Sequence, residues 1–157
     1  MPGISVSKLI PEFTAEATSN RSINSSELRG RNVVLYFYPR DNTPGCTTES
    51  QDFRDHLEDF RALNTEVIGV SRDSLASHEK FRDKHNFGFD LIADPDEHLC
   101  KLFDVIREKN MYGRKVMGVE RSTFLIDAEG VLRREWRKVK VPGHVDEVLE
   151  AARELKG

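Results

Sequence analysis

The 157-residue chain contains no apolar run near the length of about 20 residues that a membrane-spanning helix needs. Its N-terminus has no basic segment followed by an apolar core, so no secretory signal is expected. Only two cysteines are present, and they lie far apart in the sequence. Two distant cysteines form no disulfide framework, and without a signal they predict a protein of the reducing cytoplasm.

The charge balance argues against further classes of function. The formal net charge of −3 is unlike that of proteins whose binding depends on the nucleic-acid backbone. The histidines show no metal-ligand spacing, so no metal site is predicted, and His78 and His85 are expected on a solvent-exposed helix face. A basic cluster near the C-terminus is interpreted as a solvated strand edge; it comprises Arg133, Arg134, Arg137, Lys138 and Lys140.

Length and composition predict a single domain over residues 1–157 with a substantial core. Hydrophobic patterns predict a short extended segment over 11–24, and strands over 32–38, 66–71, 91–93, 115–120, 122–127 and 131–138. Helices are predicted after Cys46, from 73 to about 86, from Asp94 onward and over 146–155, with 106–115 as a polar loop. This order predicts an α/β protein with a mixed sheet covered on both faces.

The most informative segment places Cys46 where a buried strand ends and a helix begins. Residues 32–38 are nearly continuously apolar, as expected of a central strand, and Pro39 and Pro44 mark the loop that follows. A helix N-terminus presents free backbone N–H groups and a partial positive charge, and both favour a thiolate. Because the thiolate is the nucleophilic form, this placement predicts a reactive cysteine.

The helix after Cys46 is predicted to be long and amphipathic. Phe53, Leu57 and Phe60 recur at helical spacing, and the cysteine projects toward the same side. Cys46 is therefore expected on the floor of a sheltered pocket, whereas Glu49 is expected on an outer face of the helix.

The pattern Pro39-x-x-x-Thr43-x-x-Cys46 resembles the active-site motif of the peroxiredoxins. The surrounding Tyr-Phe-Tyr-Pro and Thr-Pro-Gly-Cys-Thr resemble the PrxQ subfamily, also called bacterioferritin comigratory proteins, and the resemblance extends over residues 5–155. It implies a thioredoxin-like fold with a central mixed β-sheet flanked by helices and an N-terminal extension. It also implies a peroxidase, often monomeric, that uses no metal or other cofactor and reduces hydrogen peroxide and organic hydroperoxides.

The resemblance assigns four catalytic residues. Cys46 is the nucleophile and becomes a sulfenic acid, although a buried cysteine can also be an ordinary core residue. Thr43 is expected to hydrogen-bond the sulfur and the peroxide, and Pro39 to shield the sulfur from water. Arg121, which precedes a predicted core strand, is expected to hold the thiolate and to orient the peroxide oxygens.

The chain departs from the family at the resolving cysteine. Relatives carry it five residues after the nucleophile, where this chain has Gln51, or in the next helix near Arg82. Nothing in the sequence brings Cys100 within the Cα separation of about 7 Å from Cys46 that a disulfide needs. The sequence therefore predicts a one-cysteine mechanism, in which an external thiol (thioredoxin, glutaredoxin or a small thiol) reduces the sulfenic acid.

Two other functions use the same cysteine. A redox sensor or holdase with slow turnover would also lack a resolving cysteine. A disulfide oxidoreductase usually carries Cys-x-x-Cys, but here Cys46 is followed by Thr-Thr-Glu, which disfavours that function.

Overall fold

The computed structural model describes residues 4–155. The strands in this part of the chain are β1 (Thr14–Ala17), β2 (Arg21–Asn24), β3 (Asn32–Phe37), β4 (Thr65–Ser71), β5 (Asp90–Ala93), β6 (Ile106–Met111), β7 (Arg114–Val119), β8 (Ser122–Ile126) and β9 (Leu132–Trp136). The helices are α1 (Pro44–Asp55), α2 (Leu57–Ala62), α3 (Leu75–His85), α4 (His98–Leu102) and α5 (His144–Glu154), with a 3-10 turn at Ser25–Leu28.

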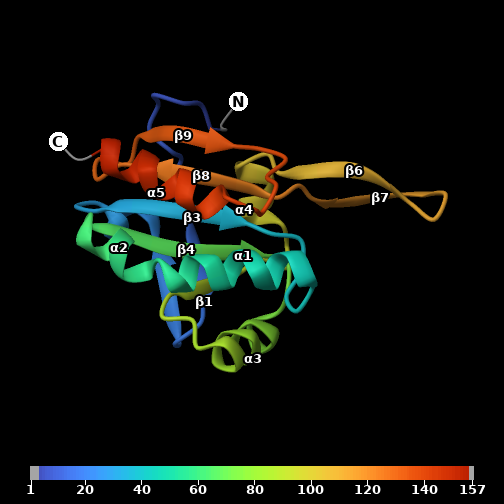
Figure 1. Cartoon of the computed structure of the whole chain (residues 1–157). Coiled ribbons are helices and arrows are strands. Elements are labelled where there is room, and N and C mark those ends of the chain that lie inside the picture. The colour runs from blue at the N-terminus through green and yellow to red at the C-terminus, as the bar shows by residue number, and fades with distance from the viewer. Residues whose placement is uncertain (1–3, 156–157) are drawn as a thin grey trace.

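Seven strands form one mixed sheet in the order β2-β1-β5-β4-β3-β8-β9. Figure 1 shows β4, β3, β8 and β9 one beside the next. Strand β3 lies near the centre, parallel to β4 and antiparallel to β8. The nearly continuous apolar sequence of β3 is explained by this position, because both faces of a central strand are covered. The predicted mixed sheet flanked by helices is confirmed, and the hairpin β1–β2 adds the predicted N-terminal extension at one edge.

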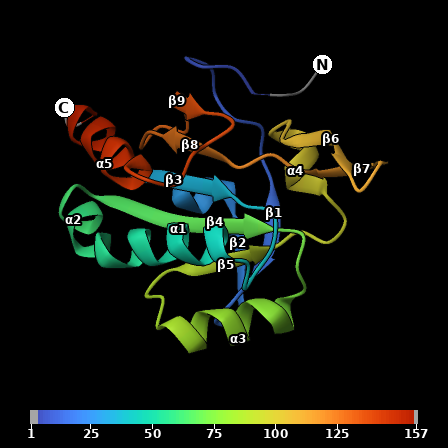
Figure 2. The same cartoon turned by 45° about the vertical axis from the view of Figure 1, so that its right-hand side comes forward.

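The sheet separates two hydrophobic clusters, because successive side chains of a strand point to opposite faces. On one face, Tyr36 and Tyr38 pack with apolar residues of α1, α2, α3 and α5. On the other face, Leu35 and Phe37 pack with α4 and with the segment before β1. Figure 2 shows α1, α2 and α5 on one side of the sheet and α4 on the other.

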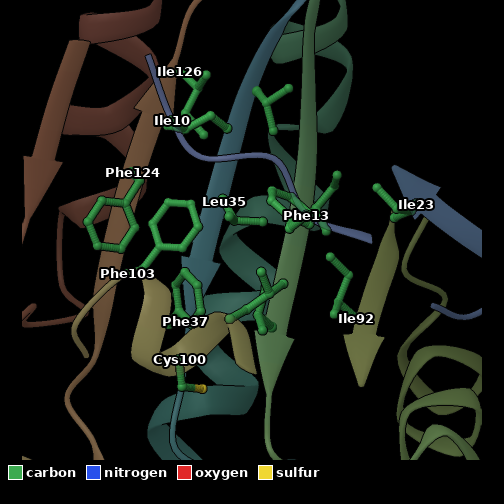
Figure 3. Close-up of a cluster of buried hydrophobic side chains, with 14 of the residues drawn as sticks. Ile10, Phe13, Ile23, Leu35, Phe37, Ile92, Cys100, Phe103, Phe124 and Ile126 are labelled. Atoms are coloured by element: carbon green, nitrogen blue, oxygen red, sulfur yellow. The ribbon is translucent and has the colours of Figure 1, made fainter. Parts of the chain in front are cut away.

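Figure 3 shows the cluster on the α4 face. The ring of Phe103 lies 5.3 Å from that of Phe37 and 5.0 Å from that of Phe124, measured between centroids. Cys100 belongs to this cluster, whereas Cys46 belongs to the cluster on the opposite face. The two cysteines are therefore separated by the sheet.

Two helices differ from the sequence prediction. The helix after Cys46 is not continuous, because His56 leaves the helical conformation (φ −105°, ψ 7°), and α2 begins after it. The next difference concerns α4, which begins at His98 rather than at Asp94. Glu97 is in the left-handed region, and the Asp94 carboxylate accepts the N–H groups of Leu99 and Cys100, so Asp94 holds the start of the helix from outside it.

The prediction of a polar loop over 106–115 is wrong. Strands β6 and β7 pair there as a two-stranded antiparallel ribbon that extends away from the main sheet (Figure 1). The polar sequence lacks the hydrophobic alternation by which a strand is recognised, because the ribbon is held by main-chain hydrogen bonds and buries little apolar side-chain surface. Tyr112 at its tip is 98% exposed.

The chain before β1 covers part of edge strand β9. The N–H of Ser7 donates to the carbonyl of Leu132 over 2.7 Å, and the N–H of Leu132 donates to the carbonyl of Lys8 over 3.0 Å. Residues 7 and 8 thus satisfy main-chain groups that an open edge would present to another chain. Within residues 4–155, no helix is both long enough and apolar enough to cross a membrane.

Candidate active site

The first turn of α1 positions Cys46. Thr43 is the N-cap residue, with an extended backbone, and Pro44 is the first helical residue. Proline fits there because its missing N–H would have no partner inside the helix. Cys46 is the third residue of the helix and is only 1% exposed. The prediction of a sheltered cysteine at a helix N-terminus is confirmed.

Arg121 reaches this cysteine from the end of the loop between β7 and β8. One nitrogen of its guanidinium, Nη2, lies 3.4 Å from the sulfur of Cys46, and the other, Nη1, donates to Oε1 of Glu49 over 2.6 Å. The sequence-predicted pair Cys46 and Arg121 is therefore brought together, although 75 positions separate the two residues in the chain. A fixed cation at this distance stabilises negative charge on the sulfur.

Gly45 allows this approach. A methyl group at Gly45 would lie 3.1 Å from Nη2 of Arg121, which is closer than ordinary packing contacts. The absence of a side chain at this position leaves room for the guanidinium beside the sulfur.

Glu49 is a site residue that the sequence prediction placed wrongly. It is fully buried, not on an outer face, because residues three apart in a helix lie on the same side and Cys46 points inward. Burial raises the pKa of Glu49 to about 7, although Arg121 opposes this shift. Its position three residues after the inward-pointing Cys46 could have indicated that Glu49 is buried.

The charges of the site affect Arg121 in turn. Burial lowers the pKa of Arg121, but the neighbouring Glu49 and Cys46 outweigh it and raise that pKa above its ordinary value. The guanidinium therefore remains a cation beside the sulfur. Oε2 of Glu49 has no hydrogen-bond partner among the described residues, so the whole carboxylate depends on Arg121.

Thr43 and Pro39 lie in the loop that leads to Cys46, and both are half-buried. The hydroxyl of Thr43 donates to the carbonyl of Arg40 over 2.8 Å and thus closes the loop on itself. Its predicted contacts with the sulfur and with peroxide, and the predicted shielding by Pro39, remain predictions.

Two histidines of this region are buried, one of them against the prediction. His78 was expected on a solvent-exposed face but is 0% exposed, because α3 turns it toward the sheet. His144 lies at the start of α5, where its Nε2 is 2.8 Å from the hydroxyl of Thr123. Burial lowers the pKa of His144 to about 4, so this imidazole is neutral near pH 7.

Cys100 is remote from this arrangement. It is fully buried in α4 on the other face of the sheet, and both cysteines are free. Burial, followed by the hydrogen bond to Asp94, raises the pKa of the Cys100 thiol well above its ordinary value. A thiol in this state is a poor nucleophile.

Comparison with known proteins relates this geometry to a family. The model of the AhpC/TSA family matches residues 6–135. Peroxiredoxin Bcp of Xanthomonas campestris is 56% identical over 122 residues, which cover 78% of this chain and 76% of the relative, and peroxiredoxin Bcp of Bacillus subtilis is 46% identical over 97% of both chains. A structure of the X. campestris bacterioferritin comigratory protein, from work on its alkyl peroxide reduction activity, superposes with a TM-score of 0.88 at 46% identity over 92% of both chains.

Proposed function

Since the chain belongs to the AhpC/TSA family, and within it to the PrxQ (Bcp) peroxiredoxins, it is a thiol-dependent peroxidase, and we propose that Cys46 is its peroxide-reacting residue. One observation carries the proposal. The sulfur of Cys46 lies at the N-terminus of α1, 3.4 Å from a guanidinium that a buried carboxylate holds in place. These groups favour both the thiolate and the charge that develops on the departing oxygen.

In the first step, the thiolate sulfur of Cys46 attacks one peroxide oxygen. A sulfur–oxygen bond forms while the oxygen–oxygen bond breaks, and the second oxygen leaves with the electron pair and takes a proton from solvent to become water or an alcohol. Cys46 is oxidised to a sulfenic acid. Arg121 stabilises the leaving oxygen, Thr43 positions the peroxide, and Pro39 shields the sulfur from water.

In the second step, an external thiol reduces the sulfenic acid. The thiol sulfur attacks Cys46, releasing water and forming a mixed disulfide, and a second thiol then breaks this disulfide and restores the cysteine. The position of Cys100 beyond the sheet supports this one-cysteine route. Because Cys46 is buried, we propose that the first turn of α1 loosens to admit the thiol.

The proposal extends to substrates and setting. The X. campestris structure concerns alkyl peroxide reduction, and we propose hydrogen peroxide and organic hydroperoxides as substrates here. The reductant is thioredoxin, glutaredoxin or a small thiol, and the protein acts as a monomer in the cytoplasm, where such thiols are kept reduced.

Intact mass after one equivalent of hydrogen peroxide tests the one-cysteine route. The expected result is a gain of one oxygen, about 16 Da, that maps to Cys46. A loss of about 2 Da, from two hydrogens, would indicate an internal disulfide with Cys100 and would contradict the route.

A pair of variants tests the assignment of the nucleophile. Cys46→Ser is expected to abolish peroxide consumption with dithiothreitol as the reductant, because a serine hydroxyl is not ionised near neutral pH. Cys100→Ser is the matched control and is expected to retain full activity. Peroxidase activity in the Cys46 variant would overturn the assignment.

The absence of a cysteine beside Cys46 also favours a second role, a thiol-based sensor or holdase, because an unresolved sulfenic acid persists. The two functions differ in turnover. Steady peroxide consumption with a thiol donor is expected of the enzyme, whereas a sensor would stop after one equivalent.

A further inference from the structure

The buried imidazole of His78 faces a hydrogen-bond acceptor at each ring nitrogen. Nδ1 lies 2.8 Å from Oδ2 of Asp41, and Nε2 lies 2.9 Å from the carbonyl of Ile92 in β5. The carbonyl can only accept, so Nε2 carries a proton. The side chain of His78 is 0% exposed and that of Asp41 is 1% exposed, so no solvent separates the pair.

Asp41 also accepts hydrogen bonds from two other side chains. Its Oδ1 accepts the hydroxyl of Tyr38 over 2.6 Å, and its Oδ2 accepts the hydroxyl of Ser77 over 2.8 Å. Nδ1 of His78 is a third group within hydrogen-bond distance of this carboxyl group. Asp41 is therefore held from three directions, by Tyr38, Ser77 and His78.

This pair joins α3 to the loop that carries the candidate active site. Asp41 lies in the loop between Pro39 and Thr43, and its own N–H donates to Oδ2 of Asp73 over 2.8 Å. Asp73 lies just before α3 and also accepts the hydroxyl of Ser71. The loop is thus held at its centre by the side chain and by the backbone of the same residue.

Asp41, Asp73 and His78 also have the composition of a metal-binding group, with ligand atoms within 4.8 Å of one another. Their contacts indicate another purpose. Nε2 of His78 faces the Ile92 carbonyl, and the Asp41 carboxylate is already shared by three protein groups. The cluster is a hydrogen-bonded anchor.

We propose that His78 is a positioning residue, which acts through Asp41 to hold the loop of Pro39 and Thr43 in the geometry that reacts with peroxide. The inference rests on the proposed role of Cys46. Reaction with peroxide needs a fixed loop, because a displacement of about 1 Å can cost about 100-fold in rate. Reduction by an external thiol needs the same region to open. Loss of the anchor therefore slows the first step and speeds the second.

Two substitutions test the two hydrogen bonds of the imidazole one at a time. The amide nitrogen of asparagine occupies the place of Nδ1, so His78→Asn keeps a donor toward Asp41. The amide nitrogen of glutamine occupies the place of Nε2, so His78→Gln keeps a donor toward Ile92 but loses the bond to the loop. His98→Gln, at an exposed position in α4, is the matched control.

Each variant is mixed with hydrogen peroxide, and the formation of sulfenic acid is followed by the mass of quenched samples. Dithiothreitol is then added, and the loss of the sulfenic acid is followed in the same way. His78→Gln is expected to react about 10- to 100-fold more slowly with peroxide and to be reduced severalfold faster. His78→Asn and His98→Gln are expected to remain within about threefold of the unaltered protein in both steps.

A purely structural role would lower the melting temperature without moving the two rates in opposite directions. Unaltered rates in His78→Gln, or equal losses in His78→Asn and His78→Gln, would overturn the proposal. If His78→Gln does not fold, Ser77→Ala removes one donor from Asp41, and unaltered rates there would count equally against it. Failure of the unaltered protein to form sulfenic acid would instead refute the proposed function.

Discussion

The guanidinium of Arg121 contacts two groups, the carboxylate of Glu49, which holds it in place, and the sulfur of Cys46, on which it acts. Glu49 is buried, and one of its oxygens has no hydrogen-bond partner within residues 4–155, so its charge costs free energy that an apolar core residue would avoid. This cost is understandable at an active site, because a guanidinium fixed before the reaction need not reorganise during it. Stability is thus given up where chemistry requires a fixed charge.

The pKa of Glu49 predicts a pH-dependent stability difference. Its folded value of about 7 lies above the ordinary value of 4.5, so the folded protein binds this proton more tightly than the unfolded chain. The cost of the charge is absent at low pH, grows as the pH rises from about 4.5 to 7, and is complete above that. Between pH 5 and pH 8, Glu49→Gln should gain about 2–3 kcal/mol over the unaltered protein in free energy of unfolding.

Urea unfolding of both proteins at the two pH values measures this difference, and other titrating groups cancel in the comparison. Glu58→Gln is the control, since the side chain of Glu58 is 86% exposed in α2. A Glu49→Gln advantage that does not grow between pH 5 and pH 8 would show that Glu49 titrates normally.

At the scale of elements, the start of α1 favours close approach of Arg121 to Cys46 over helix stability. Gly45 is a poor helix residue, yet it stands one residue before the cysteine, where any side chain would press against Arg121. The ribbon of β6 and β7 likewise buries little apolar surface, and the chain reaches Arg121 directly after it.

Gly45→Ala is therefore expected to separate stability from activity. The added methyl group moves Nη2 of Arg121 away from the sulfur and should lower the rate of reaction with peroxide by about 10-fold. Helix propensity should offset the crowding by up to about 1 kcal/mol, so the melting temperature should fall little or rise. Thr48→Ala, at an exposed position of the same helix, is the control for both measurements. An unaltered rate would show that the guanidinium can shift without loss.

At the scale of the whole molecule, the sheet separates the two cysteines. Cys46 in α1 lies on one face of it and Cys100 in α4 on the other, so one cysteine can be oxidised while the other remains in the core. Its edge at β9 is partly paired with residues 7 and 8, and the middle of β9 exposes Arg133, Arg134 and Glu135. Charged residues on an edge strand disfavour pairing with another sheet.

These features predict a monomer. Light scattering coupled to size-exclusion chromatography should give the mass of one chain, 18.0 kDa, for the reduced protein at micromolar concentration. Dithiothreitol in the buffer excludes disulfide-linked pairs through Cys46. A mass of two chains under these conditions would point to an interface that the charged edge does not prevent.

How much the sequence predicted depends on the range of the interactions involved. The order of strands and helices and the position of Cys46 at a helix N-terminus follow from periodicity and turn residues, which act over a few positions. The same local rules failed for the ribbon, whose pairing rests on main-chain groups, and for His56, which interrupts the helix. Arg121 was found only because its surrounding sequence resembles that of a family.

By itself, the sequence determined a strand, a loop with two prolines, and a cysteine in the first turn of a helix. Only the tertiary structure decided that Glu49 holds the arginine, that His78 lies under the loop, and that the sheet separates Cys100 from Cys46. The physical reason is that burial of a charged or titratable side chain depends on which distant element packs against it. Hydrophobic patterns describe a favourable face, but they do not identify the partner that covers it.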